Sequence, residues 1–94
     1  MEIQHQRGNK GMFYVGEITD PLAVMTYSLP SAHQMVIEHT EVNKALRGQN
    51  VGYQLVESAV EFARANQLKI TPVCPFAASV FRKKKEFADV LKKF

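Results

Sequence analysis

Hydrophobic and polar positions alternate along the first 42 residues, and a period of two predicts β-strands. Short segments rich in turn-forming residues, among them "GNKG" and "PSAH", separate the runs. Connections of this length favour an antiparallel meander. The expected strands are residues 2–7, 12–18, 22–29 and 34–42, with Asp20–Pro21 breaking the second from the third.

The last of these strands carries the residues of greatest chemical interest. Strict alternation predicts that Met35, Ile37, His39 and Glu41 lie on one face of this strand. The other face then presents Val36, Glu38, Thr40 and Val42. Adjacent Glu38 and His39 are therefore expected on opposite faces of the sheet.

The period changes after Gly52, where apolar residues take the spacing of one helical face: Leu55, Val56, Ala59, Val60 and Ala63. This helix is expected to end near Asn66, a residue that tolerates the left-handed conformation of a helix C-terminus.

A short buried strand is expected at residues 68–74, followed by a helix whose first turn holds Pro75 and a last helical turn or two at 86–94. The helical crossover between strands 34–42 and 68–74 makes that pair parallel. The order β-β-β-β-α-β-α-α, in a mostly antiparallel twisted sheet, predicts an α+β fold.

Length and composition set limits on what the chain can be. With 94 residues, 46% of them hydrophobic and 22% charged, we expect one globular domain spanning residues 1–94. No apolar run approaches the roughly 18 residues of a membrane span, and no signal peptide is evident at the N-terminus. Cys74 stands alone, so neither an internal disulfide nor a zinc site is expected, and a reducing cytoplasm is the default location.

Charge is concentrated at one end of the chain. The net charge is +3, but the segment from Arg82 onward carries six basic and two acidic residues, a local +4. A basic end of this kind has four interpretations: it binds nucleic acid, an acidic partner or a phosphorylated small molecule, or it is simply a solvated helix face. No nucleic-acid-binding module is evident and the aromatic residues are not interleaved with the basic run, which argues against nucleic acid.

The segment "RGQNVG" at residues 47–52 precedes the long helix and has the character of an anion site. Backbone N–H groups at a helix N-terminus lack intrahelical partners, and the helix dipole favours negative charge there. Gly48 and Gly52 allow close approach of a ligand, and Arg47 adds a cation. An ordinary connecting loop also fits, but no Walker-type Gly-Lys-Ser/Thr follows.

Three motifs carry a resemblance to a known family: "HTEV" at residues 39–42, "LRGQ" at 46–49 and "CPF" at 74–76. Together they resemble the GCN5-related N-acetyltransferases, and within them a subfamily of small single domains. The resemblance runs from about Met12 to Val90.

The acyl-CoA signature of that family is Gln/Arg-x-x-Gly-x-Gly/Ala. Arg47 and Gly52 hold its first and last places, and Asn50 stands where the family has glycine. Asparagine tolerates positive φ, so the turn remains possible.

The resemblance implies that the chain binds acetyl-CoA, with the pyrophosphate on backbone N–H groups of residues 47–53 and the pantetheine along the strand at residues 41–42. The cofactor-binding residues expected on this basis are Glu41, Val42, Arg47, Gly48, Gln49, Asn50, Val51, Gly52, Tyr53, Phe76 and Phe81. Only "GNKG" stands where the family has two helices, so an open acceptor side is expected. The amine acceptor is not identified.

The candidate catalytic residues are Glu38, His39 and Cys74. Glu38 or His39 is a possible base that takes a proton from the amine. The alternative is that Glu38 is a solvated strand residue and that His39 is a half-buried histidine. Cys74 is either a nucleophile activated at a helix N-terminus or a small buried hydrophobe. Phe81 stands where many relatives have a tyrosine acid, and phenylalanine has no proton to give.

Two functions follow from these observations. The first is N-acetyl transfer from acetyl-CoA to an amine, either a small molecule or a protein lysine. The second is an acetyl-CoA-binding module, a sensor or carrier with little or no transferase activity, which the phenylalanine at position 81 favours.

Overall fold

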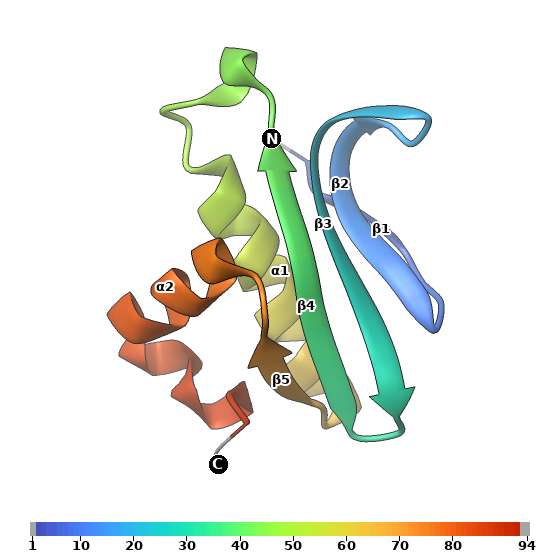
Figure 1. The fold of residues 1–94 in the computed structure, drawn as a ribbon, viewed down its shortest axis with the longest axis vertical. Helices are drawn as coiled ribbons and strands as arrows, with labels where there is room; N and C mark the ends of the chain where they lie inside the picture. The colour runs from blue at the N-terminus through green and yellow to red at the C-terminus, as the bar shows by residue number, and fades with distance from the viewer. Residues whose placement is uncertain (1, 93–94) are drawn as a thin grey trace.

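The computed structural model describes residues 2–92 and shows one five-stranded sheet with helices packed against it (Figure 1). The strands lie in the order β1-β2-β3-β4-β5, antiparallel except for the parallel pair β4 and β5. Their bounds are β1 Gln4–Gln6, β2 Lys10–Glu17, β3 Asp20–Ser31, β4 Gln34–Val42 and β5 Lys69–Pro72. The predicted α+β class, meander and parallel pair are confirmed.

Two α-helices and two 3₁₀ helices complete the described chain: η1 Lys44–Leu46, α1 Val51–Asn66, α2 Pro75–Lys83 and η2 Lys85–Val90. The predicted last helical segment is thus a 3₁₀ helix, and α2 ends before it because Lys84 leaves the helical conformation at φ −104° and ψ 88°. The prediction for residues 93–94 lies outside the described part of the chain. Within that part, no helix combines the length and apolarity that a membrane span needs.

The β2–β3 hairpin is tighter than the sequence predicted. Asp20 and Pro21 do not break the sheet; they begin β3, and Asp20 pairs with Glu17. Proline is tolerated at the start of a strand, where a missing N–H costs least. The pairing shifts register between Val15 and Gly16, and Gly16 takes up this irregularity at φ 91°.

A β-bulge in β4 changes which side chains face which way. Tyr27 of β3 lies opposite Ile37, but Thr26 lies opposite His39, which leaves Glu38 as an extra residue on β4. A one-residue insertion reverses the alternation for every residue that follows. Beyond the bulge, therefore, it is Thr40 that shares the face of Ile37.

The predicted faces of β4 are consequently wrong from the bulge onward. Val42 lies opposite the buried Ala23, on the same face as Ile37. His39 and Glu41 lie on the other face, and Glu38 and His39 are both exposed instead of being divided between core and solvent. A prediction that extends strict alternation along the sequence cannot detect an unpaired bulge residue.

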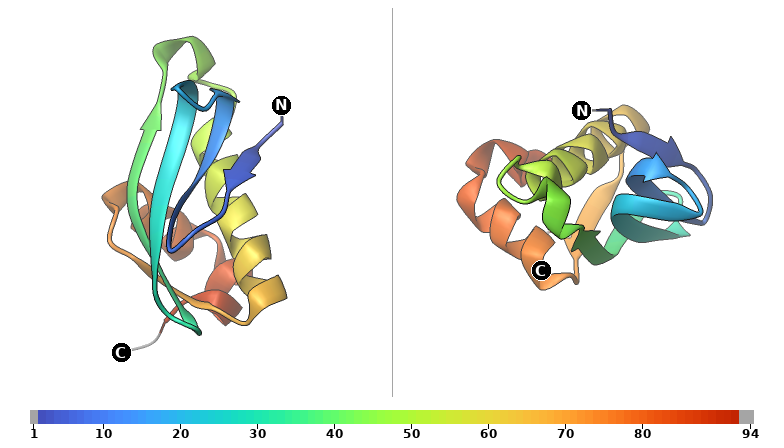
Figure 2. Two further views of the ribbon diagram at one scale, coloured as in Figure 1. Left: turned by 90° about the vertical axis from the view of Figure 1, so that its right-hand side faces the viewer. Right: turned by 90° about the horizontal axis from the view of Figure 1, so that it is seen from above.

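The core lies between one face of the sheet and α1. All five residues of the predicted helical stripe are fully buried, and they pack with sheet residues such as Phe13, Met25 and Ile37. Figure 2 shows α1 lying along this face of the sheet, with no helix of the described chain over the opposite face of β2 and β3. That face is only half-buried at Tyr14 and Val24.

Both ends of α1 are formed by residues in the left-handed conformation. Asn50 precedes the helix at φ 58° and Gln67 follows it at φ 57°. The positive φ expected at Asn50 is confirmed. At the C-terminus, Asn66 is still helical and Gln67 takes the left-handed position, its N–H bonded to the Ala63 carbonyl.

Strands β4 and β5 are paired over only part of their length. The parallel ladder runs from Gln34–Lys69 to Ile37–Pro72 and then stops. The N–H groups of Val73 and Cys74 both reach the Ile37 carbonyl, at 3.0 and 3.1 Å, and the chain then turns into α2 with Pro75 in its first turn. The edge of β4 beyond Ile37 therefore has no strand beside it among the described residues.

Candidate functional site

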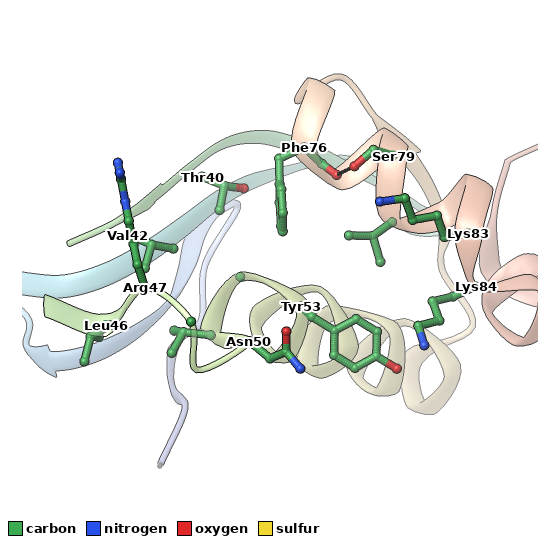
Figure 3. A pocket seen from close by; sticks show the side chains of 14 residues that line it. Thr40, Val42, Leu46, Arg47, Asn50, Tyr53, Phe76, Ser79, Lys83 and Lys84 are labelled. Atoms are coloured by element: carbon green, nitrogen blue, oxygen red, sulfur yellow. Dashed lines mark hydrogen bonds between the residues drawn. The ribbon is translucent and has the colours of Figure 1, made fainter. Parts of the chain in front are cut away.

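A cleft of about 630 Å³ opens where β4, the start of α1 and one side of α2 meet (Figure 3). Three segments distant in sequence build it, because the end of the β4–β5 ladder lets α2 stand away from β4. The residues that line it are Thr40, Val42, Leu46, Arg47, Gly48, Asn50, Val51, Gly52, Tyr53, Phe76, Ser79, Val80, Lys83 and Lys84.

The loop that leads into α1 is shaped by its own backbone. Asn43 caps η1, since its Oδ1 accepts the Ala45 N–H at 2.9 Å. Gly48 has φ 85°, and a Cβ there would have no atom within 4 Å. The left-handed backbone therefore accounts for glycine at this position, and the chain arrives at Asn50 with its backbone beside the cleft.

The first turn of α1 has the free N–H groups expected of an anion site. Its first hydrogen bond runs from the Gln54 N–H to the Asn50 carbonyl at 3.0 Å. The N–H groups of Val51, Gly52 and Tyr53 come before this bond in the chain. They have no hydrogen-bond acceptor within the helix, because no helical turn precedes them. No acidic side chain lies in this turn, so nothing local offsets the positive end of the helix dipole.

Gly52 has a structural role that the sequence did not reveal. A Cβ at this position would lie 2.6 Å from Cζ of the Phe76 ring, which extends from the start of α2 toward α1 (Figure 3). The ring can lie over the helix N-terminus because residue 52 has no side chain. Phe76 is nevertheless 41% exposed, and it forms one wall of the cleft.

The charges in the cleft are all positive. Arg47, Lys83 and Lys84 line it, and no carboxylate is among the lining residues. Lys84 Nζ lies 4.9 Å from the centre of the Tyr53 ring, and that ring stacks on Phe87 with centroids 5.9 Å apart. The Tyr53 ring is therefore held in place by Phe87 on the side away from the cleft. With its cations and aromatic rings, the cleft suits an anion that also carries a flat or apolar group.

Cys74 lies just behind the cleft wall. It is 6% exposed, and its Sγ donates a hydrogen bond to Thr40 Oγ1 at 3.4 Å. Burial raises the pKa of this thiol, but the Thr40 hydroxyl and backbone N–H groups, including those of Phe76 and Ala77, lower it more, so that the pKa lies below its ordinary value. The Cys74 side chain precedes α2 but makes no regular cap hydrogen bond to it.

The other two catalytic candidates lie on the outer face of the sheet. His39 Nε2 is 3.7 Å from Glu41 Oε1, and both side chains are well exposed. The bulge produces this pair, since it turns both residues away from α1. Glu38 is exposed as well, and the described residues give it no hydrogen bond or ion pair.

Most of the predicted cofactor-binding residues come together in the cleft. Three do not line it: Glu41, Gln49 and Phe81. The carbonyl of Gln49 accepts the Gln54 side-chain amide at 3.2 Å. Phe81 is buried on the far side of α2, where its ring packs edge-on against Phe87.

Six lining residues are outside the predicted set. Lys83 and Lys84 belong to the basic end of the chain, and the other four are Thr40, Leu46, Ser79 and Val80. A signal existed for the two in α2, because residues 76, 79, 80 and 83 follow the spacing of one helical face that begins at the predicted Phe76. Thr40 had no such signal, since the bulge decides its direction.

The sequence matches the family described as GCN5-related N-acetyl-transferase over residues 12–90. The chain belongs to this family. The predicted resemblance is therefore confirmed over most of the chain. The search of curated proteins returned no significant match.

Solved structures agree with the family assignment. The NMR structure of a GCN5-like protein from Staphylococcus aureus has 38% sequence identity and a TM-score of 0.78. The match covers 99% of this chain and 89% of that one. The two proteins thus share the small form of the fold almost from end to end.

Two more distant structures share the fold alone. An aminoglycoside N-acetyltransferase AAC(6')-Iy in complex with CoA has 11% identity and a TM-score of 0.59, with 82% of this chain and 67% of that one covered. An IAA acetyltransferase from Bacillus cereus has 18% identity and a TM-score of 0.57, with 80% and 53% covered.

Proposed function

We propose that the cleft binds acetyl-CoA and that the protein transfers the acetyl group to an amine. The observation that carries the proposal is a helix N-terminus with free N–H groups in a cleft lined by three cations and no carboxylate. The Gly48–Tyr53 backbone would hold the pyrophosphate. Lys83 and Lys84, at the other end of the cleft, would meet further phosphate charge.

The unpaired edge of β4 supports the same ligand. Pairing with β5 ends at Ile37, so the backbone groups of the edge beyond it are available to an extended amide chain. A pantetheine arm has two amides and can bind there as an added strand. It would then run between Phe76 and Val42, with its thiol end toward Thr40 and Cys74.

Transfer to an amine requires a group that accepts a proton. His39 is the best-placed residue, because its ring is exposed on the acceptor side and Glu41 lies 3.7 Å from it. A carboxylate beside an imidazole can orient the ring. We therefore assign proton acceptance to His39 and its orientation to Glu41, with exposed Glu38 as the alternative base.

Cys74 has two possible roles in this scheme. As a nucleophile, its thiolate would form a bond to the acetyl carbon while the bond to the CoA sulfur breaks, and the released CoA thiolate would take up a proton. As a structural thiol, it would hold Thr40 in the cleft wall through the hydrogen bond of 3.4 Å. The lowered pKa of the thiol favours the first role, and its burial favours the second.

A second candidate function is an acetyl-CoA-binding module with little or no transferase activity. Phe81 favours it, because the family's usual tyrosine acid is replaced by a ring without a hydroxyl, buried against Phe87. Binding and transfer therefore need separate tests.

Binding is tested by calorimetric titration with acetyl-CoA at low and high salt. We expect Lys83→Ala and Lys84→Ala each to weaken binding about two- to fivefold at low salt, the range of an exposed ion pair, and less at high salt. Lys10→Ala on β2 is the matched control and should leave the affinity unchanged. Wild-type protein that does not bind acetyl-CoA would contradict the proposal.

Transfer is tested by thiol release from acetyl-CoA with a panel of amines. We expect His39→Gln to lower kcat by about 10²-fold or more, the usual contribution of a general base, with acetyl-CoA affinity retained. Mass spectrometry after incubation with acetyl-CoA decides the role of Cys74, since an acetyl adduct absent in Cys74→Ala identifies a nucleophile. Binding without turnover of any amine would select the module.

A further inference from the structure

A bidentate ion pair joins the end of α1 to η2, outside the cleft. Arg64, in the last turn of α1, donates from Nε to Asp89 Oδ2 at 2.9 Å and from Nη2 to Asp89 Oδ1 at 2.8 Å. The same Nη2 donates to the Glu86 carbonyl at 2.7 Å. Exposed ion pairs contribute little unless their geometry is well defined, and a bidentate guanidinium–carboxylate pair meets that condition.

Cations from two elements bind the backbone of η2. Arg64 of α1 contacts the Glu86 carbonyl, and Lys69 Nζ of β5 donates to the Asp89 carbonyl. The hydrogen bond from Arg64 holds the pKa of the Asp89 carboxyl below its ordinary value. Asp89 therefore stays ionised, and the ion pair stays formed, throughout the neutral pH range.

Two residues of the cleft depend on where η2 lies. Phe87 of η2 is buried, and its ring stacks on the Tyr53 ring with centroids 5.9 Å apart. Lys84 directly precedes η2 as its N-cap residue and extends toward the Tyr53 ring (Figure 3). A shift of η2 would therefore move the support of Tyr53 and the cation beside it together.

The backbone of η2 does not fix this position by itself. It is a 3₁₀ helix of six residues, and such short helices have poor hydrogen-bond geometry. Lys84 departs from helical angles, so the direction of α2 does not continue into η2. Phe87 and Val90 attach η2 to the core, but apolar contact has no preferred direction. The directional contacts are those of Arg64 and Lys69.

We propose that Arg64 and Asp89 are positioning residues for the acetyl-CoA cleft, although neither lines it. Their ion pair holds η2 in the place where Phe87 supports the Tyr53 ring and Lys84 lies at the rim of the cleft. This inference rests on the proposed binding of acetyl-CoA and extends that site to a contact between α1 and η2.

The sign of one charge substitution separates positioning from simple electrostatics. Asp89→Asn makes the protein more positive, so long-range attraction alone predicts tighter binding of the anionic acetyl-CoA. Positioning predicts the opposite, and we expect Asp89→Asn to weaken binding about two- to fivefold, the range of an exposed ion pair. Calorimetric titration at a temperature where every variant is folded measures this. Glu61→Gln, an exposed charge change on α1 close to Arg64, is the matched control and should not weaken binding.

Two further variants test the route from the ion pair to the cleft. The exchange Arg64→Asp with Asp89→Arg keeps the net charge and should recover part of the lost affinity. In a Tyr53→Leu background, Asp89→Asn should weaken binding less than in wild type, because residues that act through one another are not additive. In ligand-free Asp89→Asn, the NMR resonances of the Tyr53 and Phe87 rings should shift.

The outcomes distinguish this inference from the proposed function. Wild-type protein that does not bind acetyl-CoA would overturn both. If wild type binds and Asp89→Asn binds equally well or more tightly, only the positioning role is refuted. Urea denaturation identifies a merely structural ion pair, since the free energy of unfolding would then fall while the affinity of the folded protein stayed unchanged. Equal weakening by Asp89→Asn with and without Tyr53→Leu would also overturn the proposed route.

Discussion

At the scale of single residues, the contact between Cys74 and Thr40 decides how the thiol behaves. The two residues are 34 positions apart in sequence, and their hydrogen bond joins the start of α2 to β4 at the cleft wall. The Thr40 hydroxyl is the largest of the influences that lower the pKa of Cys74, and it opposes the effect of burial.

We therefore expect Thr40→Val to raise the pKa of the Cys74 thiol. Loss of the hydroxyl removes a stabilising partner of the thiolate, while burial continues to favour the neutral form. The rate of iodoacetamide alkylation as a function of pH measures this, and its midpoint should lie higher in Thr40→Val than in wild type. Ser79→Ala, which alters another cleft hydroxyl, is the control. An unchanged midpoint would show that backbone N–H groups alone set the pKa.

At the scale of elements, α1 brings the cleft its N–H groups and the core its apolar stripe. Both of its terminal residues, Asn50 and Gln67, have a left-handed backbone without being glycine. That conformation costs a residue with a Cβ about 1–2 kcal/mol, and asparagine less. Only the N-terminal one lies in the cleft.

Glycine substitutions separate the conformational role of these two residues from any ligand contact. We expect Gln67→Gly to raise the free energy of unfolding by about 0.5–1 kcal/mol with acetyl-CoA affinity unchanged. Asn50→Gly should be neutral or mildly stabilising, and it should preserve or tighten binding. Urea denaturation and calorimetry measure the two quantities. Clearly weaker binding by Asn50→Gly would assign the asparagine side chain a ligand contact of its own.

At the scale of the whole molecule, His5 links the first strand to the rest of the fold. Its Nε2 and the Tyr27 hydroxyl are 2.5 Å apart, and its ring stacks on Phe13 at 4.0 Å and meets Phe62 of α1 edge-on at 4.7 Å. Burial and, secondarily, the charge of Arg7 lower the pKa of His5. Protonation would place a cation among these rings.

Stability should therefore fall in mild acid. The unfolded chain binds a proton near pH 6.5, whereas the folded chain binds it only at lower pH, so the free energy of unfolding decreases as pH falls from 6.5 through the lower folded value. Urea denaturation between about pH 7.5 and about pH 5 measures this dependence. His5→Gln should flatten it, and His33→Gln, in the exposed β3–β4 turn, should not. Equal slopes in wild type and His5→Gln would contradict the assignment to His5.

The amino-acid sequence by itself determined the period of two, the helical stripe, the α+β order and the loop at the start of α1. These features depend on interactions between near neighbours in the chain, or on which side of one element is apolar. The family followed from short motifs, and the left-handed Asn50 from its residue type and place before the helix.

Tertiary structure alone decided which of the chemical groups meet. The bulge at Glu38 depends on how β4 pairs with β3, and it moved His39 and Glu41 to the outer face. The contact of Cys74 with Thr40 joins two segments that are far apart in sequence. Periodicity along a chain reports the burial of one element but not its register against another, and here that register sets the chemistry of both sides of β4.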